Sequence, residues 1–169
     1  QQCHGGGGVG TFKADCENVS KIIDQLQPLQ QYIVSPFLES ISVNTHIFIS
    51  SKQTILSPGS IQLVETKDSQ LLYSGCDYIA YRNLDNIIKE KIKNLSLKIA
   101  NFLRKENYSG IAGIDFIIDK NQNVYCAEIN PRFQASTMLI DMYLKEHVKD
   151  PLEATSTFEI NEMAFNNTI

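Results

Sequence analysis

The residues whose types and spacing could do chemistry lie close together, near position 130. Asp115 and Glu128 stand on the two halves of a predicted β-hairpin, and Asn130 follows Glu128 by two positions. Side chains two apart share a strand face, and facing residues of a hairpin lie close together, so all three side chains can converge on one point. Carboxylate and amide oxygens are the ligand types that magnesium prefers, usually together with substrate phosphates.

The same residues also have a plain structural explanation. Polar residues fall at every second position of a half-buried strand, so the spacing alone does not distinguish a metal site from a solvent face. Pro131 ends the strand and Arg132 follows it. A guanidinium with its fixed fork of donors then lies near the carboxylates, as a phosphoryl or acyl-phosphate site requires. This neighbour favours a functional site.

Helices that would support this hairpin are predicted from apolar spacing. Apolar residues recur every three or four positions at 84–102, which predicts a long helix behind an Asn83 cap. The same spacing predicts a short helix at 19–26. A last helical region is predicted from about residue 136, with a restart in which Asp150 is the cap.

Strands are predicted from alternation and from turn residues. Apolar and polar residues alternate at 41–49, which indicates a strand with one buried face. Further short strands are bounded by turn signals: 31–34, 54–56, 61–65, 71–73, 78–81, 111–118 and 123–129. The polar turn 119–122 joins the last two into the hairpin that carries the carboxylates.

The hairpin sequence Gly113–Asp119 followed by Tyr125–Arg132 resembles the signature of ATP-grasp enzymes, nearest the carbamoyl-phosphate synthetase and biotin carboxylase type. The resemblance implies an α+β ATP-grasp fold. In that fold, residues 1–36 form a small glycine-loop lobe, and residues 37–169 form a larger lobe with an antiparallel sheet and packed helices.

The resemblance also implies roles for the hairpin residues. Asp115, Glu128 and Asn130 would coordinate magnesium, or manganese in its place, between the phosphates of ATP. Arg132 would contact the transferred phosphoryl group or the acyl phosphate, so Arg132 and Asn130 are the candidate catalytic residues.

A glycine cluster near the N-terminus provides backbone amides that can approach phosphates closely. Its members are Gly5, Gly6, Gly7, Gly8 and Gly10. By itself such a cluster is more simply a linker or a tight turn. In its chain order before the hairpin, it resembles the phosphate-covering loop of the family. Many members carry a lysine about four residues before this loop, where Gln1 stands here.

The segment after the short helix resembles the strand between the lobes whose backbone binds adenine. Its residues are Gln31, Tyr32 and Ile33. Glu39 is the candidate acid for the ribose hydroxyls, and an exposed loop carboxylate is an equally good interpretation.

Composition argues against several function classes. The 15 Lys+Arg against 19 Asp+Glu give a net charge of -4, so there is no basic field for nucleic acid. No apolar run approaches the ~18 residues that span a bilayer. The 4 cysteines form no CxxC pair, so we expect reduced thiols and a cytoplasmic protein. His46 stands apart from any cysteine or acidic cluster, so we expect it at the surface or in the core.

The resemblance implies an ATP-dependent ligase that activates a small-molecule carboxylate as an acyl phosphate for attack by an amine or similar nucleophile. Two alternatives stay open: a bicarbonate-activating domain of the carboxylase type, and a nucleotide-binding module without catalysis. The sequence starts at Gln1, with the glycines close behind. We therefore expect a C-terminal fragment that lacks an N-terminal domain of the same protein and is incomplete or inactive alone. A homodimer is left open.

Overall fold

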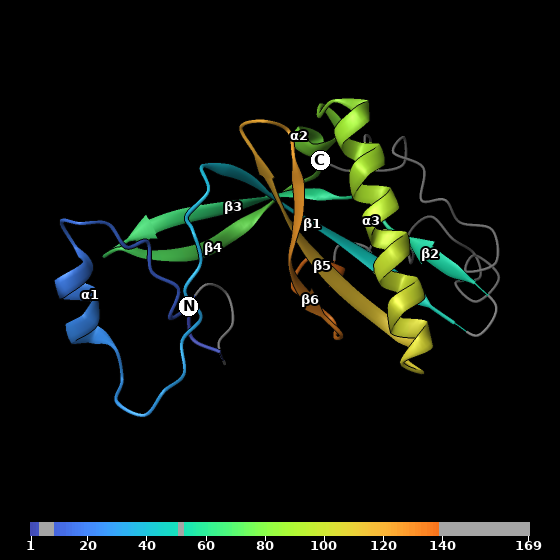
Figure 1. The fold of residues 1–169 in the computed structure, drawn as a ribbon. Helices are drawn as coiled ribbons and strands as arrows, with labels where there is room; N and C mark the ends of the chain where they lie inside the picture. Colours follow the sequence, from blue (N-terminus) through green and yellow to red (C-terminus); the bar gives the residue numbers. More distant parts are fainter. Residues whose placement is uncertain (4–8, 51–52, 139–169) are drawn as a thin grey trace. The chain divides into compact units, whose positions relative to one another are not determined.

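The computed structural model describes residues 1–3, 9–50 and 53–138, and these residues form an α+β fold (Figure 1). The elements in chain order are α1 (Val19–Gln25), β1 (Ser40–Ile49), β2 (Thr54–Leu56), β3 (Ser60–Lys67), β4 (Gln70–Asp77), α2 (Tyr78–Arg82), α3 (Asn86–Lys105), β5 (Gly110–Asp119) and β6 (Val124–Asn130). The strands form an antiparallel sheet in the order β4-β3-β1-β5-β6, and β2 pairs with β1 outside this path. The predicted α+β class is confirmed.

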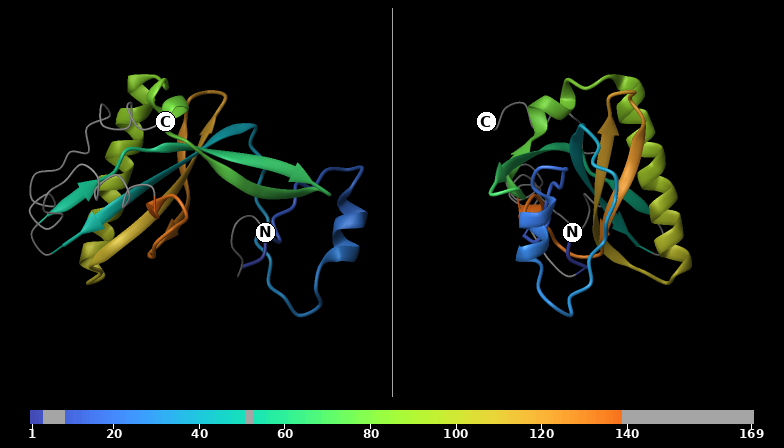
Figure 2. Two further views of the ribbon diagram at one scale, coloured as in Figure 1. Left: turned by 180° about the vertical axis from the view of Figure 1, so that it is seen from behind. Right: turned by 60° about the vertical axis from the view of Figure 1, so that its left-hand side comes forward.

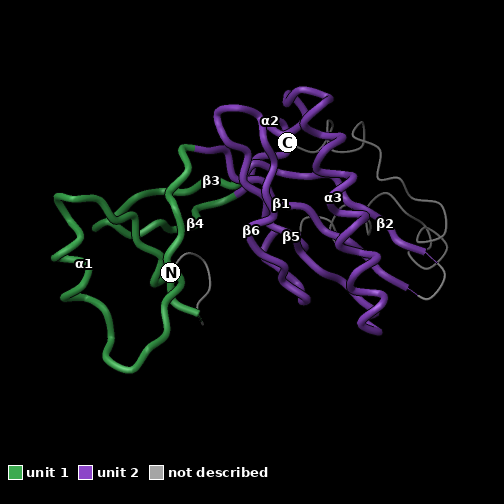
Figure 3. Tube along the Cα trace, in the orientation of Figure 1, with its two compact units in different colours: residues 1–39, 62–75 green, residues 40–61, 76–169 purple. Residues whose placement is uncertain are grey.

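The described residues divide into two compact units (Figure 3). Unit 1 contains Gln1–Glu39 and Gln62–Gly75, and unit 2 contains Ser40–Ile61 and the described residues from Cys76 onward. The sequence-based division after residue 36 placed all of 62–75 in the second part, whereas the structure groups it with the first.

Backbone pairing explains why 62–75 belongs to unit 1. The backbone N–H of Lys13 donates to the carbonyl of Ser69 at 2.9 Å, and that of Leu71 donates to the carbonyl of Thr11 at 3.0 Å. These contacts link the β3–β4 turn to the N-terminal segment. Apolar spacing carries no information about such a pairing. The assignment of 1–36 and 37–169 as functional lobes stays a prediction.

The hydrophobic core of unit 2 lies between the sheet and α3. Figure 2 shows α3 running along one face of the central strands. The core side chains are Val43, Ile47, Ile49, Tyr81, Ile88, Ile92, Ala100, Ala112, Ile114, Phe116 and Ile118. On β1 all of them occupy odd positions and on β5 all occupy even positions, as strand alternation requires for one buried face. The remaining positions of β1 and β5 therefore project from the opposite face of the sheet.

Three local predictions are wrong. Residues 78–81 are not a strand but belong to α2, because the Asp77 side chain accepts a hydrogen bond from the Ala80 N–H at 2.8 Å and caps a helical turn. The cap of α3 is Asp85, which accepts from the Ile87 N–H at 2.7 Å, and not Asn83. Residues 31–34 form no regular strand, and Tyr32 makes an isolated bridge with Gln2.

The other predicted elements are found close to their expected positions. β1, α3 and the β5–β6 hairpin match their patterns. The helix expected from about residue 136, including its Asp150 cap, falls almost entirely outside the described residues. No helix in the described ranges has both the length and the hydropathy that crossing a membrane requires.

Candidate functional site

The hairpin places Asp115 and Glu128 directly opposite each other. In the antiparallel register of β5 and β6, Asp115 faces Glu128 and Gly113 faces Asn130. Facing residues project to the same side of the sheet, and so do residues two apart on one strand. The structure therefore brings Asp115, Glu128 and Asn130 to one face, as the sequence spacing suggested. Their roles in metal binding stay a prediction.

A β-bulge follows this facing pair. The register shifts between Asp115 and Phe116, and Phe116 pairs with Cys126, so Ala127 is an extra residue on β6. Bulges bend a strand locally and re-aim the neighbouring side chains. Sequence reasoning missed this feature, because the two strands read as regular apolar runs and neither glycine nor proline marks the bulge.

A line of facing polar residues continues from the hairpin across two more strands. β1 pairs Asn44 with Asp115, and β3 pairs Ser60 with Asn44. We call Ser60, Asn44, Asp115 and Glu128 the polar row, because these facing residues cross β3, β1, β5 and β6 in one line. Ser60 and Asn44 are buried, Asp115 is half-buried and Glu128 is exposed. The row thus runs from the interior to solvent on the face opposite α3.

Both carboxylate oxygens of Asp115 accept hydrogen bonds from side-chain amides. Asn44 Nδ2 donates to Oδ1 at 2.6 Å, and Asn130 Nδ2 donates to Oδ2 at 3.2 Å. Hydrogen bonds to a charged acceptor are shorter and stronger than those between neutral groups. The two amides therefore fix the orientation of the Asp115 carboxylate.

Asn130 also connects this carboxylate to Arg132. Arg132 Nη2 donates to Asn130 Oδ1 at 3.2 Å, and Nη1 donates to the carbonyl of Phe133 at 3.1 Å. Asn130 is buried, whereas the Arg132 side chain is exposed. A cationic group thus lies beside the carboxylates with its outer surface open to solvent, and it can meet an anionic ligand there.

The segment after Arg132 is hydrogen-bonded to Asn44, one of the two buried residues of the polar row. Asn44 Nδ2 donates to Gln134 Oε1 at 2.8 Å, and Ser136 Oγ donates to Asn44 Oδ1 at 3.0 Å. Ser136 Oγ also lies 3.3 Å from His46 Nε2. Sequence reasoning missed Asn44, Gln134 and Ser136, because their partners are about 70–90 residues apart along the chain.

His46 occupies the core, one of the two locations expected for it. It faces Gly113 across the β1–β5 pair and is 1% exposed. Burial lowers the pKa of His46 to about 4. The imidazole is therefore neutral near pH 7 and acts there as a hydrogen-bonding group of the sheet face.

The negative charge of Asp115 acts on the neighbouring thiol of Cys126. Burial raises the pKa of Cys126, and the charge of Asp115 raises it further, against a smaller opposing effect of a hydrogen bond with the Glu128 backbone.

Among the residues that the structure describes, no three or more His, Cys, Asp or Glu side chains lie together as possible metal ligands. A closed transition-metal site needs three or four such ligands.

Magnesium, in contrast, is commonly held by one or two carboxylates with phosphate oxygens and waters. The oxygen donors of Asp115, Glu128 and Asn130 meet this requirement. In the observed orientation, Asn130 Nδ2 points to Asp115 and Oδ1 to Arg132. Coordination through Oδ1 would therefore exchange the Arg132 contact for the cation.

The residues expected to bind the nucleotide belong to unit 1, and several of them lie outside the described residues. Gly5, Gly6, Gly7 and Gly8 are outside the described residues. Gly10 is described, and its carbonyl accepts from the Gln2 N–H at 3.0 Å. Its φ is +75°, and a Cβ would lie 2.6 Å from Gln2 Cδ. The positive φ and the close Gln2 side chain both favour glycine at this position, independently of any ligand.

The expected adenine-binding segment pairs with the N-terminus. Ile33 exchanges two backbone hydrogen bonds with Gln1, at 2.8 and 2.9 Å, and the Cys3 N–H donates to the carbonyl of Gln31 at 3.0 Å. In an antiparallel pair, alternate residues present their backbone groups to opposite edges. The backbone groups of Tyr32 thus face away from Gln1–Cys3. Glu39 is exposed and is the last residue of unit 1 before β1.

The model of the ATP-grasp domain family matches residues 2–136. A D-alanine–D-alanine ligase B of Clostridium tetani (strain Massachusetts / E88) is 38% identical over 89 residues, which are 50% of this chain and 23% of that protein.

Solved structures are also similar to this chain. A biotin carboxylase from Campylobacter jejuni, in complex with a βγ-ATP ligand, aligns with a TM-score of 0.47 and 19% identity over 68% of this chain and 23% of its own. An N5-carboxyaminoimidazole synthetase from Staphylococcus aureus, complexed with ADP, aligns with a TM-score of 0.44 and 18% identity over 65% and 26%. The chain thus spans about a quarter of the length of these proteins.

Proposed function

Because the chain belongs to the ATP-grasp family, we propose that it forms the nucleotide- and magnesium-binding part of an ATP-dependent ligase. The membership agrees with the resemblance of the hairpin sequence. The ligase that is 38% identical over 89 residues supports ligation as the reaction class. The observation that carries the proposal is the facing pair Asp115 and Glu128, with Asn130 hydrogen-bonded to Asp115 on one side and to Arg132 on the other.

The proposed reaction has two steps. A substrate carboxylate oxygen attacks the γ-phosphorus of ATP, and the bond from this phosphorus to the β–γ bridging oxygen breaks. ADP is the leaving group, and the substrate becomes an acyl phosphate. An amine then attacks the acyl carbon, the bond to the phosphate oxygen breaks, and inorganic phosphate and the amine proton are released. Phosphoryl transfer of this kind depends mainly on positioning and on charge stabilisation.

The residues of the hairpin would divide this work. Asp115, Glu128 and Asn130 would hold magnesium, or manganese in its place, which when bound neutralises phosphate charge. Arg132 would donate hydrogen bonds to the transferred phosphoryl group, since its fork of donors is exposed beside these ligands.

In unit 1, the glycine cluster would cover the phosphates. Tyr32, between Gln31 and Ile33, would present its backbone to adenine, and Glu39 would accept from the ribose hydroxyls. That the substrates are a small-molecule carboxylate and an amine, and that the protein is cytoplasmic, are expectations for the whole protein.

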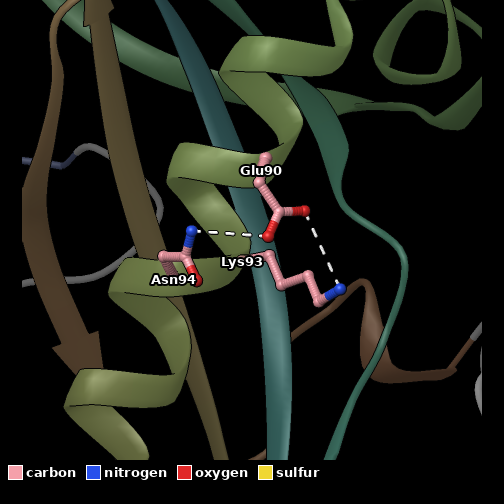
Figure 4. Close-up of polar contacts among 3 residues, drawn as sticks. All are labelled: Glu90, Lys93 and Asn94. Atoms are coloured by element: carbon pink, nitrogen blue, oxygen red, sulfur yellow. Dashed lines mark hydrogen bonds and ion pairs between the residues drawn. The ribbon is translucent and has the colours of Figure 1, made fainter.

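Replacing Glu128 by Gln tests the proposal in the full-length protein. The change keeps the size of the side chain and removes its charge, so ATP turnover with magnesium should fall about 100-fold or more. A matched control is Glu90→Gln on α3 (Figure 4). Glu90 is 58% exposed, lies 3.7 Å from Lys93 Nζ and accepts from Asn94 Nδ2 at 3.4 Å. Such surface contacts contribute ~1 kcal/mol or less.

Several outcomes are distinguishable in this assay. Turnover by Glu128→Gln at the rate of Glu90→Gln would overturn the metal assignment. Turnover that depends on bicarbonate would favour the carboxylase-type reaction. Binding of ATP by the full-length protein without turnover would favour a nucleotide-binding module.

A further inference from the structure

The side-chain amide of Asn44 connects the polar row to the segment that carries Arg132. Its Nδ2 donates to Asp115 Oδ1 at 2.6 Å and to Gln134 Oε1 at 2.8 Å, and its Oδ1 accepts from Ser136 Oγ at 3.0 Å. Asn44 itself is 3% exposed. One buried amide thus uses both of its ends on two different parts of the site.

The side chain of Gln134 packs closely against the backbone of Gly113. A Cβ on Gly113 would lie 1.7 Å from Gln134 Oε1 and 2.1 Å from Cδ, so the glutamine amide rests directly on the Gly113 backbone. Ser136 is 6% exposed, and the Gln134 N–H donates to Thr137 Oγ1 at 2.9 Å. The turn after Arg132 is therefore closed on itself and fastened to β1.

We propose that Asn44 is a positioning residue that fixes both the Asp115 carboxylate for metal binding and the Arg132–Thr137 segment beside it. The part that concerns the metal rests on the proposed function, whereas the part that concerns the segment does not. Residues that hydrogen-bond to a metal ligand orient it, and their loss typically weakens metal binding about 10–100-fold. Asn44 would act through Asp115 and Gln134 without touching the nucleotide.

Manganese binding tests the first half of the proposal without relying on activity. The full-length protein is titrated with Mn²⁺ in the presence of ADP, and free Mn²⁺ is read from its electron paramagnetic resonance signal. We expect Asn44→Ala to bind about 10-fold or more weakly than the unaltered protein. The control is Ser60→Ala, because Ser60 faces Asn44, is 1% exposed, and its Oγ has no hydrogen-bond partner in the described structure.

Trypsin tests the second half without metal or nucleotide. Arg132 is exposed, and cleavage after it requires the Arg132–Thr137 segment to open. Cleavage follows the population of the opened form. We expect Asn44→Ala and Gln134→Ala to accelerate the cut between Arg132 and Phe133, mapped by mass spectrometry, about 10-fold. Ser60→Ala should leave its rate unchanged.

The outcomes separate this proposal from the proposed function. If Asn44→Ala matches Ser60→Ala in both assays, the proposal is overturned. A second contrary result is that Asn44→Ala accelerates cleavage but keeps its Mn²⁺ affinity, while Asp115→Asn lowers that affinity. In that case Asn44 does not position the carboxylate, and the proposal fails as stated. If the unaltered protein binds no Mn²⁺ with ADP, the proposed function fails, and the cleavage assay still decides the role of Asn44 in the segment. Should Asn44→Ala not fold, Gln134→Ala decides the segment role.

Discussion

Asn130 joins a carboxylate to a guanidinium through the two ends of its side-chain amide. Nδ2 donates to Asp115 and Oδ1 accepts from Arg132, each at 3.2 Å. Because Asn130 is 7% exposed, neither contact is readily replaced by water. A change in the charge of this side chain should therefore disturb the site more than a change in its shape.

The Asn130→Asp variant isolates that charge. It retains the size of the side chain, removes the donor to Asp115 and puts a second carboxylate beside it. We expect the free energy of unfolding without magnesium to fall by about 1–3 kcal/mol. Added magnesium should restore part of the loss, because a ligand that binds the folded state stabilises it. Urea unfolding with and without magnesium measures both effects.

A matched control is Asn94→Asp on α3. Asn94 is exposed and donates to Glu90 at 3.4 Å, so the variant also creates a pair of carboxylates but in water. Its unfolding should shift by about 0.5 kcal/mol or less, independently of magnesium. Equal effects of the two variants would contradict a metal role for Asn130.

His46 gives the fold a defined pH dependence. Its pKa is about 4 in the folded state against 6.5 for the ordinary side chain, because it is buried. The unfolded state therefore binds more protons in this window, and stability falls as the pH drops from 6.5 towards 4, by at most about 3 kcal/mol. Urea unfolding measured from pH 7.5 to 4 should show this slope. His46→Gln should flatten it, and an unchanged slope would exclude His46 as its source.

The sequence alone identifies only part of this cluster. Asp115, Glu128, Asn130 and Arg132 lie within one hairpin, where local spacing predicts which side chains meet. Asn44 contacts Asp115 through strand register between distant segments, and no local pattern specifies that register. His46 was expected at the surface or in the core, and the structure shows it buried, but its contact with Ser136 could not be foreseen.

At the scale of elements, the β5–β6 hairpin depends on a glycine inside a strand. Gly113 faces Asn130 on β6 and His46 on β1, and Gln134 lies over it. A glycine within a strand often marks a place where another group approaches the backbone closely. Here the approaching group is the Gln134 amide.

The Gly113→Ala variant should displace Gln134. Overpacking of this kind typically costs about 1–3 kcal/mol in the free energy of unfolding. Gln134→Ala removes the group that would clash, so Gly113→Ala should cost less in the Gln134→Ala background. Urea unfolding of the two single variants and the double variant measures this coupling. Strictly additive effects would show that the two residues do not press on each other.

Long patterns predicted their elements well, whereas two of the short patterns, 31–34 and 78–81, did not. β1 and α3 extend over 10 and 20 residues, and both were expected from apolar spacing. Residues 78–81 read as a strand because all four are apolar or aromatic, but the Asp77 cap decides for a helix. A side-chain cap of this kind outweighs a weak β preference over one turn.

At the scale of the whole molecule, the fold was predictable because a single motif identified it. The hairpin sequence implied an ATP-grasp fold, and the family match to residues 2–136 bears this out. The composition of the two units was not predictable, since residues 62–75 join 1–39 through backbone contacts. The chain covers 23% of the ligase to which it is similar, so its substrates stay a proposal.

Calorimetric titration of ATP into the full-length protein, with and without magnesium, tests the central claim most directly. If Asp115, Glu128 and Asn130 hold a magnesium ion between the protein and the phosphates, magnesium should tighten ATP binding. This gain should be lost in Glu128→Gln and retained in Glu90→Gln. ATP binding that is equally tight without magnesium, or a gain that persists in Glu128→Gln, would contradict the claim.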